Sequence, residues 1–356
     1  MGFRITTNMS MNTYRFNLQG SMKKLSDARD KVLTQRSFTS YAEDPTSATL
    51  AFRLRRDYCK TTNYLNNTKD VYSKFNTAWH NLGGVVEDLS DATARVASIQ
   101  GNSDTAGESR KALAVVLRET SESVVHAMNQ QLGDHFVFAG NDGLNVPFSW
   151  NGEKLLYRGL DVNSEDPDVQ KKLEEMANEE LYIDLGMGAQ ESTPNNAVKG
   201  SYFNSALSGV DYLGYGRDED GDPKNLALIM RELADVFETW DEDTQSYNPA
   251  NAKNSAEGLN SNELKNKANR LMDKLKAGQE HTTEKWVELD SKSVFLRTNE
   301  TQLTTQQSDL NEQILNVEQV DLADAITTFF WEQYCYNAAL KIGNQLLSQS
   351  LIDYMN

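Results

Sequence analysis

Helix-breaking residues are concentrated in one part of this 356-residue chain. Five of the six prolines lie between Pro147 and Pro249, and the sixth is Pro45. Eleven of the 21 glycines fall between Gly140 and Gly221. Proline lacks a backbone donor and clashes with the preceding helical turn. Its scarcity elsewhere therefore leaves both flanks of the chain free to form long helices.

The hydrophobic periodicity of the N-terminal flank predicts helices over 9–34 and from residue 45 onward. Asp44 and Pro45 mark the second start, because aspartate caps helix N-termini and proline suits the first helical position. A 3.5-residue repeat then runs to Val96, as is typical of a coiled-coil helix. The pair Gly83-Gly84 is its weak point. The paired apolar rows are Ala51, Tyr58, Leu65, Tyr72, Trp79 and Val86, with Leu54, Thr61, Thr68, Phe75, Leu82 and Leu89.

The C-terminal flank carries a thinner seam with the same seven-residue period. A further helix is expected over 321–356, after an interruption at 316–324. A seam this narrow requires cover from other helices. The repeating row is Ala268, Leu275, Thr282, Leu289, Leu296, Leu303, Leu310 and Val317, with Leu264, Leu271, Trp286 and Ile314 beside it.

The middle of the chain, residues 141–258, predicts a mixed α+β region. Residues 155–157 and 181–185 are strand candidates bounded by turn residues, and Phe136–Phe138 is a third just before them. Apolar positions from Leu226 to Trp240 predict one amphipathic helix.

Charge is distributed unevenly along the chain, whose net charge is −17. Residues 1–60 contain eleven Lys/Arg and five Asp/Glu, and residues 141–258 contain nine and 24. An acidic chain argues against electrostatic nucleic-acid binding. No apolar stretch reaches the ~18 residues that a membrane span requires, and the N-terminus has no apolar core typical of a secretion signal. The low apolar fraction, 38%, suits an elongated molecule.

The pattern therefore predicts a mainly α fold: a long antiparallel coiled-coil rod formed by the N- and C-terminal regions, with an α+β head. The two terminal helices meet at one end, and each carries an apolar stripe that it cannot bury alone. We expect these stripes to form an assembly interface. Its residues are Met11, Tyr14, Leu18, Met22, Leu25, Val32, Leu322, Ile326, Phe329, Tyr336, Leu340, Leu347 and Leu351.

Residues suited to catalysis or cofactor binding are scarce. The chain has no phosphate-binding loop, dinucleotide fingerprint, zinc-protease motif or nucleophile elbow, so we expect no enzyme activity and no cofactor. Cys59 and Cys335 lie in different predicted helices and are expected to be free thiols. Asp218, Asp220 and Asp222 resemble the opening of a calcium loop. They remain a weak metal candidate, because the glutamate that should close the loop is replaced by Ile229.

Six short motifs stand near the two ends of the chain. They are Arg4-Ile-Thr-Thr-Asn-Met9, the Ala42-Glu-Asp-Pro45 element with the small-residue run after it, Phe136-Val-Phe-Ala-Gly140, Asp321-Leu-Ala-Asp-Ala-Ile326, Tyr336-Asn-Ala-Ala-Leu340 and Ser350-Leu-Ile-Asp-Tyr-Met355. In this order they resemble the hook–filament junction proteins (hook-associated protein 3) of the bacterial flagellin superfamily, and the resemblance covers roughly 1–140 and 260–356.

The resemblance implies a structural role without catalysis. It implies that the chain forms a junction ring between hook and filament. It also implies synthesis in the cytoplasm, followed by export of the unfolded chain through the flagellar type III apparatus. The implied partners are further copies of the chain, the first hook–filament junction protein, filament flagellin and an export chaperone, with no nucleic acid and no membrane insertion.

Filament flagellin is the nearest alternative. Pro45 and Asp353-Tyr354 favour the junction proteins over it. A third possibility is an adhesin or an enzyme activity in the acidic middle.

The resemblance also suggests three domains. Residues 1–44 and 321–356 would form the inner coiled-coil assembly domain. Residues 45–140 and 259–320 would form the helical rod, and residues 141–258 would be a variable acidic outer domain.

Overall fold

The computed structural model describes residues 7–100, 107–188, 191–193, 196–197, 200–241 and 243–355. The first residues of the N-terminal motif therefore lie outside the described residues. The chain divides into two compact units, Met1–Thr62 with Thr304–Asn356, and Asn63–Leu303. Long helices dominate both units, and short strands occur only within the larger one among the described residues, so the chain is mainly α as predicted.

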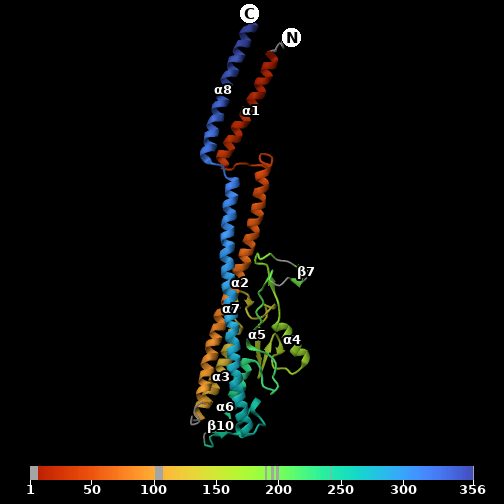
Figure 1. Cartoon of the computed structure of the whole chain (residues 1–356), viewed down its shortest axis with the longest axis vertical. Coiled ribbons are helices and arrows are strands. Elements are labelled where there is room, and N and C mark those ends of the chain that lie inside the picture. The colour runs from red at the N-terminus through yellow and green to blue at the C-terminus, as the bar shows by residue number, and fades with distance from the viewer. Residues whose placement is uncertain are drawn as a thin grey trace. The chain divides into compact units, whose positions relative to one another are not determined.

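The smaller unit pairs the two terminal helices. Helix α1 (Thr7–Thr34) lies antiparallel along α8 (Leu322–Met355), as Figure 1 shows. The first turns of α2 (Pro45–Gln100) and the last turns of α7 (Ser261–Glu318) belong to the same unit. The predicted terminal helices are therefore confirmed, with bounds within two residues of those expected.

Aspartate caps set two of these helix starts. The Asp44 carboxylate accepts hydrogen bonds from the backbone nitrogens of Thr46 at 3.1 Å and Ser47 at 3.0 Å. The Asp321 carboxylate does the same for the backbone nitrogen of Ala323 at 2.8 Å. Each bond satisfies a donor that a helix N-terminus leaves unpaired. The predicted start at Asp44-Pro45 is confirmed.

The larger unit is built on antiparallel lengths of α2 and α7. The Trp286 indole stacks on Trp79 with ring centroids 5.5 Å apart and donates from Nε1 to the Trp79 carbonyl oxygen at 3.0 Å. It lies against Gly83, where a Cβ would approach the indole to 3.4 Å. Helices α3 (Gly107–Met128) and α6 (Leu226–Glu238) pack on each other and join the same hydrophobic core. A Cβ at Gly83 would just touch the indole, so a larger side chain there would displace it.

The buried seam of α2 differs from the predicted one beyond Thr68. Tyr72, Trp79 and Val86 were expected in the seam but are only half-buried. The adjacent row is buried instead, consisting of Val71, Ala78, Val85, Ala92 and Ile99. One step of the repeat is shortened at Thr68–Val71, which rotates the buried face by one residue. Helices α3 and α6 enter the core along this length, so α2 faces more than α7 alone.

The strands of the larger unit are short and antiparallel. β3 (Phe148–Asn151), β4 (Lys154–Tyr157) and β5 (Leu160–Asp161) form one sheet. The remaining strands pair as β1 (Gln131–Leu132) with β2 (His135–Phe136), β6 (Tyr182–Ile183) with β9 (Phe203–Asn204), β7 (Glu191–Thr193) with β8 (Asn196–Ala197), and β10 (Trp240–Asp241) with β11 (Ser246–Tyr247). The short helices are α4 (Pro167–Ala177), α5 (Gly209–Leu213) and the 3₁₀ turns η1 (Pro249–Asn251) and η2 (Asn254–Ala256).

The strand predictions hold in part. The strand at 155–157 is confirmed as β4. The predicted strand Phe136–Phe138 is wrong beyond Phe136, because Val137 and Phe138 are buried outside any strand. Only Tyr182 and Ile183 of the second candidate pair as a strand. Val137, Phe138 and Leu185 of these candidates are buried, whereas Leu181 and Tyr182 are exposed.

Across the described residues, no helix is both long enough and apolar enough to pass through a membrane.

Candidate assembly surface

Small residues allow α1 and α8 to approach closely. The Tyr14 hydroxyl donates to the Ala339 carbonyl oxygen at 3.2 Å. Gly343 lies directly under this hydroxyl, so that any Cβ there would overlap it. Ala28 of α1 and Ala325 of α8 are buried. Close backbone approach through glycine and alanine thus holds the pair together, with little volume of large side chains inside it.

The segment between α1 and α2 is held against the end of α7 by backbone hydrogen bonds. Ser37 donates its backbone N–H to the Glu318 carbonyl oxygen at 2.8 Å, and Val320 donates to Gln35 at 3.2 Å. Arg55 forms an ion pair with the Glu318 carboxylate. Gln35 has a positive φ of 56° directly after the last residue of α1, the left-handed conformation in which helices commonly end. These contacts fix the corner of the smaller unit.

Helix α8 exposes large aromatic side chains on the faces turned away from α1. Phe330 is 60% exposed, Trp331 64% and Tyr334 68%, and Ile342 adds to them. A helix that is apolar around most of its circumference is normally buried in a larger structure. An exposed cluster of this kind marks an interaction site.

The predicted interface residues fall into three groups. Those half-buried in the chain alone are Met11, Tyr14, Leu18, Leu25, Val32, Phe329 and Tyr336. Those left exposed are Met22, Leu322, Ile326 and Leu340. The side chains of Leu347 and Leu351 lie outside the described residues.

A single-stripe template missed two kinds of residue at this surface. One is the small-residue row of Ala325, Ala339 and Gly343, because the predicted stripe was built from large apolar residues. The other is the exposed group Phe330, Trp331 and Tyr334, which lies off the predicted stripe. The signal that could have found the second group is the high aromatic content of 329–336, which holds Phe329, Phe330, Trp331, Tyr334 and Tyr336.

The three aspartates of the weak metal candidate are brought together in the larger unit, with oxygens within 4.8 Å of one another. The Lys274 ammonium forms ion pairs with all three, including one of 2.6 Å to Asp222, and Arg270 Nε donates to Asp222 at 3.0 Å. Burial opposes ionisation of Asp222, but the hydrogen bonds and charges of Arg270 and Lys274 outweigh it and lower the pKa of Asp222. A lysine side chain thus occupies the position where a cation would bind.

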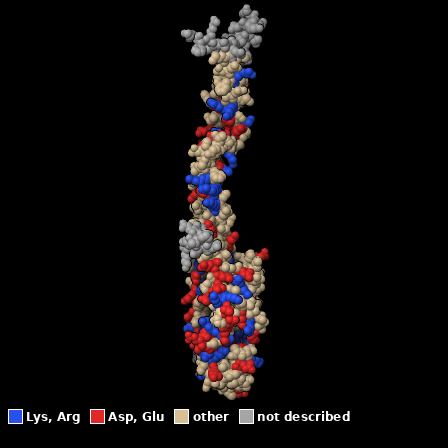
Figure 2. Space-filling view, turned by 90° about the vertical axis from the view of Figure 1, so that its right-hand side faces the viewer, with Lys and Arg blue, Asp and Glu red and all other residues tan. Residues whose placement is uncertain are grey.

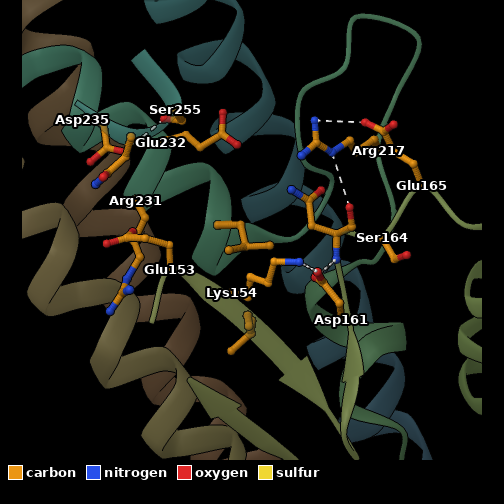
Figure 3. Close-up of a pocket in the computed structure, with 14 residues that line it drawn as sticks. Glu153, Lys154, Asp161, Ser164, Glu165, Arg217, Arg231, Glu232, Asp235 and Ser255 are labelled. Carbon is orange, nitrogen blue, oxygen red and sulfur yellow. Dashed lines mark hydrogen bonds and ion pairs between the residues drawn. The ribbon is translucent and has the colours of Figure 1, made fainter. Parts of the chain in front are cut away.

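The lining of a polar cleft of about 390 Å³ in the larger unit is drawn in Figure 3. Lys154 of β4 and Asp161 of β5 point toward each other there at 2.9 Å. Arg217 pairs with Glu165 at 3.3 Å, and Arg231 lies over the Trp150 ring at 3.6 Å. All three cations therefore have partners within the chain, and these contacts stabilise the packing of loops on the sheet.

Acidic and basic side chains mingle over the face of the larger unit seen in Figure 2. Cys59 is exposed and Cys335 half-buried, and both are free thiols as predicted.

No protein-family model and no curated protein matches the sequence. Solved structures do match. A flagellar hook-associated protein from Vibrio parahaemolyticus aligns with a TM-score of 0.54 at 13% identity, over 78% of this chain and 100% of that one. FlgL from Bacillus cereus aligns at 0.44 and 14% identity, over 74% and 99%, and FlgL from Xanthomonas campestris at 0.42 and 13%, over 72% and 99%. The likeness to the Vibrio structure concerns the fold.

Proposed function

We propose that this chain is a structural component of the bacterial flagellum, forming the junction ring between hook and filament through its terminal helices. The observation that carries the proposal is the α1–α8 pair, whose α8 leaves Phe330, Trp331 and Tyr334 exposed. A subunit that buries this face only against neighbours is suited to assembly. The fold shared with a flagellar hook-associated protein supports the same role.

Each of the three proposed domains has a separate structural role. Residues 1–44 and 321–356 form the inner assembly domain, 45–140 and 259–320 the helical rod, and 141–258 an outer domain that faces solvent. Within the first, Met22, Leu322, Ile326 and Leu340 are exposed in the single chain and available to neighbouring subunits. The predicted side chains that are half-buried hold α1 against α8.

The proposed route to this position is export of the unfolded chain by the flagellar type III apparatus, after synthesis in the cytoplasm. The exposed apolar face of α8 requires cover before assembly, which suits an export chaperone. The neighbours after assembly would be other copies of the chain, the first junction protein and filament flagellin.

Immunolabelling of intact flagella tests the proposal. We expect one band of label at the boundary between hook and filament. Label along the whole filament would instead identify a filament flagellin, which is the alternative function. No label on flagella at all would contradict both.

Deletion of 321–356 provides a second test. We expect the truncated chain to be absent from flagella, because α8 supplies the exposed aromatic face, while α2, α7 and the head remain folded. Circular dichroism and thermal unfolding check the folding. Normal incorporation of the truncated chain would contradict the role assigned to α8.

A further inference from the structure

Opposite charges occupy the two chain segments that form the smaller unit. Residues 1–62 contain eleven Lys/Arg and five Asp/Glu, which is a net charge of +6. Residues 304–356 contain one Lys and seven Asp/Glu, which is a net charge of −6. The unit is therefore neutral in total, although its N-terminal and C-terminal segments are strongly complementary.

Two basic side chains near the start of α2, Arg56 and Lys60, lie on the face turned away from α7. Ala51 and Leu54 are buried, while Phe52, Arg56 and Lys60 follow one another at four-residue spacing and are exposed. Four-residue spacing places side chains in one row on a helix. Phe52 is 73% exposed and is the apolar member of this row. We call Phe52, Arg56 and Lys60 the basic row.

The acidic charges of α7 lie on its face turned away from α2. Gln307 donates to the Thr62 hydroxyl at 2.8 Å, so that side of α7 faces α2. Asp309 and Glu312 are exposed, and no ion pair is recorded for either within the described residues. By helical periodicity both lie on the side opposite Gln307, Leu310 and Ile314. We call Asp309 and Glu312 the acidic row.

The acidic row lies at the level of the Lys60 end of the basic row along the helix pair, and Phe52 lies about two helical turns from Lys60. Thr62 is level with Gln307, and Arg55 is level with Glu318 through its ion pair. Lys60 is therefore level with the stretch 309–312. Because the rows point in opposite directions, they cannot meet within one chain, but they meet when copies stand side by side at equal height.

We infer that a second copy of this chain docks its acidic row on the basic row, with Phe52 as the apolar anchor of the contact. The inference rests on the proposed function and names the surfaces between neighbouring subunits. An interface that joins two different faces is heterologous, and repeated rotation closes it into a ring. Aromatic side chains flanked by arginine are typical anchors of such interfaces.

Charge reversal in the full chain tests the contact. Arg56→Glu/Lys60→Glu and Asp309→Lys/Glu312→Lys should each raise the dissociation constant for self-association roughly tenfold, measured by sedimentation velocity. The fourfold variant should return to within about threefold of the unchanged chain, because the pairs are restored with reversed signs. Lys171→Glu/Lys172→Glu is the matched control for the basic-row variant, since it makes the same change in net charge on exposed positions of α4.

Two results would overturn the inference. One is self-association of both single-row variants at the strength of the unchanged chain. The other is a folded fourfold variant that does not recover. Thermal unfolding verifies the fold of every variant.

Cross-linking provides an arm that does not depend on charge. Cys59 is exposed beside the basic row. Glu312→Cys combined with Cys335→Ser places a second thiol in the acidic row, on the opposite side of the helix pair. A disulfide requires Cα atoms within about 7 Å, so oxidation should join two copies and give covalent multimers. Multimers no more abundant than in Cys335→Ser with Lys172→Cys would count against the contact.

Immunolabelling separates this inference from the proposed function. If the unchanged chain labels the hook–filament boundary and the charge-reversed variants label it equally, the docking contact is wrong and the junction role stands. If the unchanged chain does not label flagella, the junction role fails, and the sedimentation and cross-linking results still decide the contact between copies.

Discussion

Two aspartates in the larger unit are almost equally buried, yet their pKa values shift in opposite directions. The side chain of Asp222 is 4% exposed and that of Asp235 is 5% exposed. Arg270 and Lys274 together stabilise the Asp222 carboxylate. At Asp235, burial outweighs the hydrogen bond from Ser255 and the charge of Arg118, and raises the pKa.

We expect Asp222→Asn to lower the free energy of unfolding by about 2 kcal/mol at pH 7, because two cations lose their buried partner. Because the pKa of Asp222 is lowered in the fold, its stabilisation is full above the ordinary aspartate value near pH 4 and is lost as pH falls from there through the lowered pKa. Thermal unfolding from pH 3 to 8 should therefore show the difference from the unchanged chain beginning to shrink below about pH 4. A difference as large at pH 3 as at pH 7 contradicts this account.

Asp235→Asn should change stability at pH 7 by less than about 1 kcal/mol, because Arg118 keeps Glu238 as a partner at 3.1 Å. The raised pKa of Asp235 means that its ionisation opposes folding. The stability contributed by protonated Asp235 is therefore fully present below the ordinary aspartate pKa and is lost as pH rises through the raised pKa. The same pH series measures both variants. A loss at pH 7 equal to that of Asp222→Asn would show that burial does not dominate at Asp235.

Gly343→Leu should separate α1 from α8, because its side chain would occupy the position of the Tyr14 hydroxyl. The expected loss is about 1–3 kcal/mol, the usual range for forcing volume into a packed contact. Amide hydrogen exchange of α1 measures it. Gly20→Ala in α1 is the control, since no atom lies within 4 Å of the added carbon there. Unchanged exchange in the Gly343 variant would contradict this packing.

Sequence pattern predicted the helices better than their contacts. The ends of α1, α2, α7 and α8 follow from Asp44, Pro45, Asp321 and the apolar periods, because capping and periodicity are local properties. The shift from Tyr72 to Val71 in the α2 seam could not be predicted, because it depends on α3 and α6 entering the same core. The pairing of Asp222 with Lys274 depends on folding over a separation of 52 residues.

The two adjacent glycines of α2 are not equivalent in the helix pair. Gly83 lies under the Trp286 indole, whereas no atom lies within 4 Å of a Cβ at Gly84. We expect Gly84→Leu to raise stability by up to about 1 kcal/mol through helix propensity. Gly83→Leu should lower it by about 1–3 kcal/mol by displacing the indole. Chemical denaturation compares the two. Equal effects would mean that Trp286 does not pack on Gly83 in solution.

The two units of the whole molecule differ in how much large apolar side chain they bury. The larger unit buries Phe75, Phe138, Phe148, Tyr157 and Phe237, whereas among the side chains described on α1 and α8 the buried hydrophobic ones are Ala28 and Ala325. Stability scales with apolar area removed from water. In the single chain we therefore expect the larger unit to be more stable than the pair of α1 and α8.

We expect amide hydrogen exchange to report this difference directly. Amides of α6 should exchange only on global unfolding, and amides of α1 and α8 should exchange much faster by local opening. Self-association should then slow exchange in α1 and α8 selectively. Uniform protection across the dilute, single chain would contradict the proposed order of stability.

The seam between α2 and α7 also contains hydroxyl layers, at Thr68, Thr282 and Ser293, among its aliphatic ones. Thr68 and Thr282 return their hydroxyls to carbonyl oxygens four residues earlier in their own helices. The Thr68 hydroxyl also accepts a hydrogen bond from the Asn299 side-chain amide of α7 at 3.2 Å, so this layer links the two helices directly. A pulling force applied at one end would open the seam one layer at a time, while a shearing load along the helices would meet all layers at once. We therefore expect the two helices to separate at a lower force when pulled apart from one end than when sheared along their length.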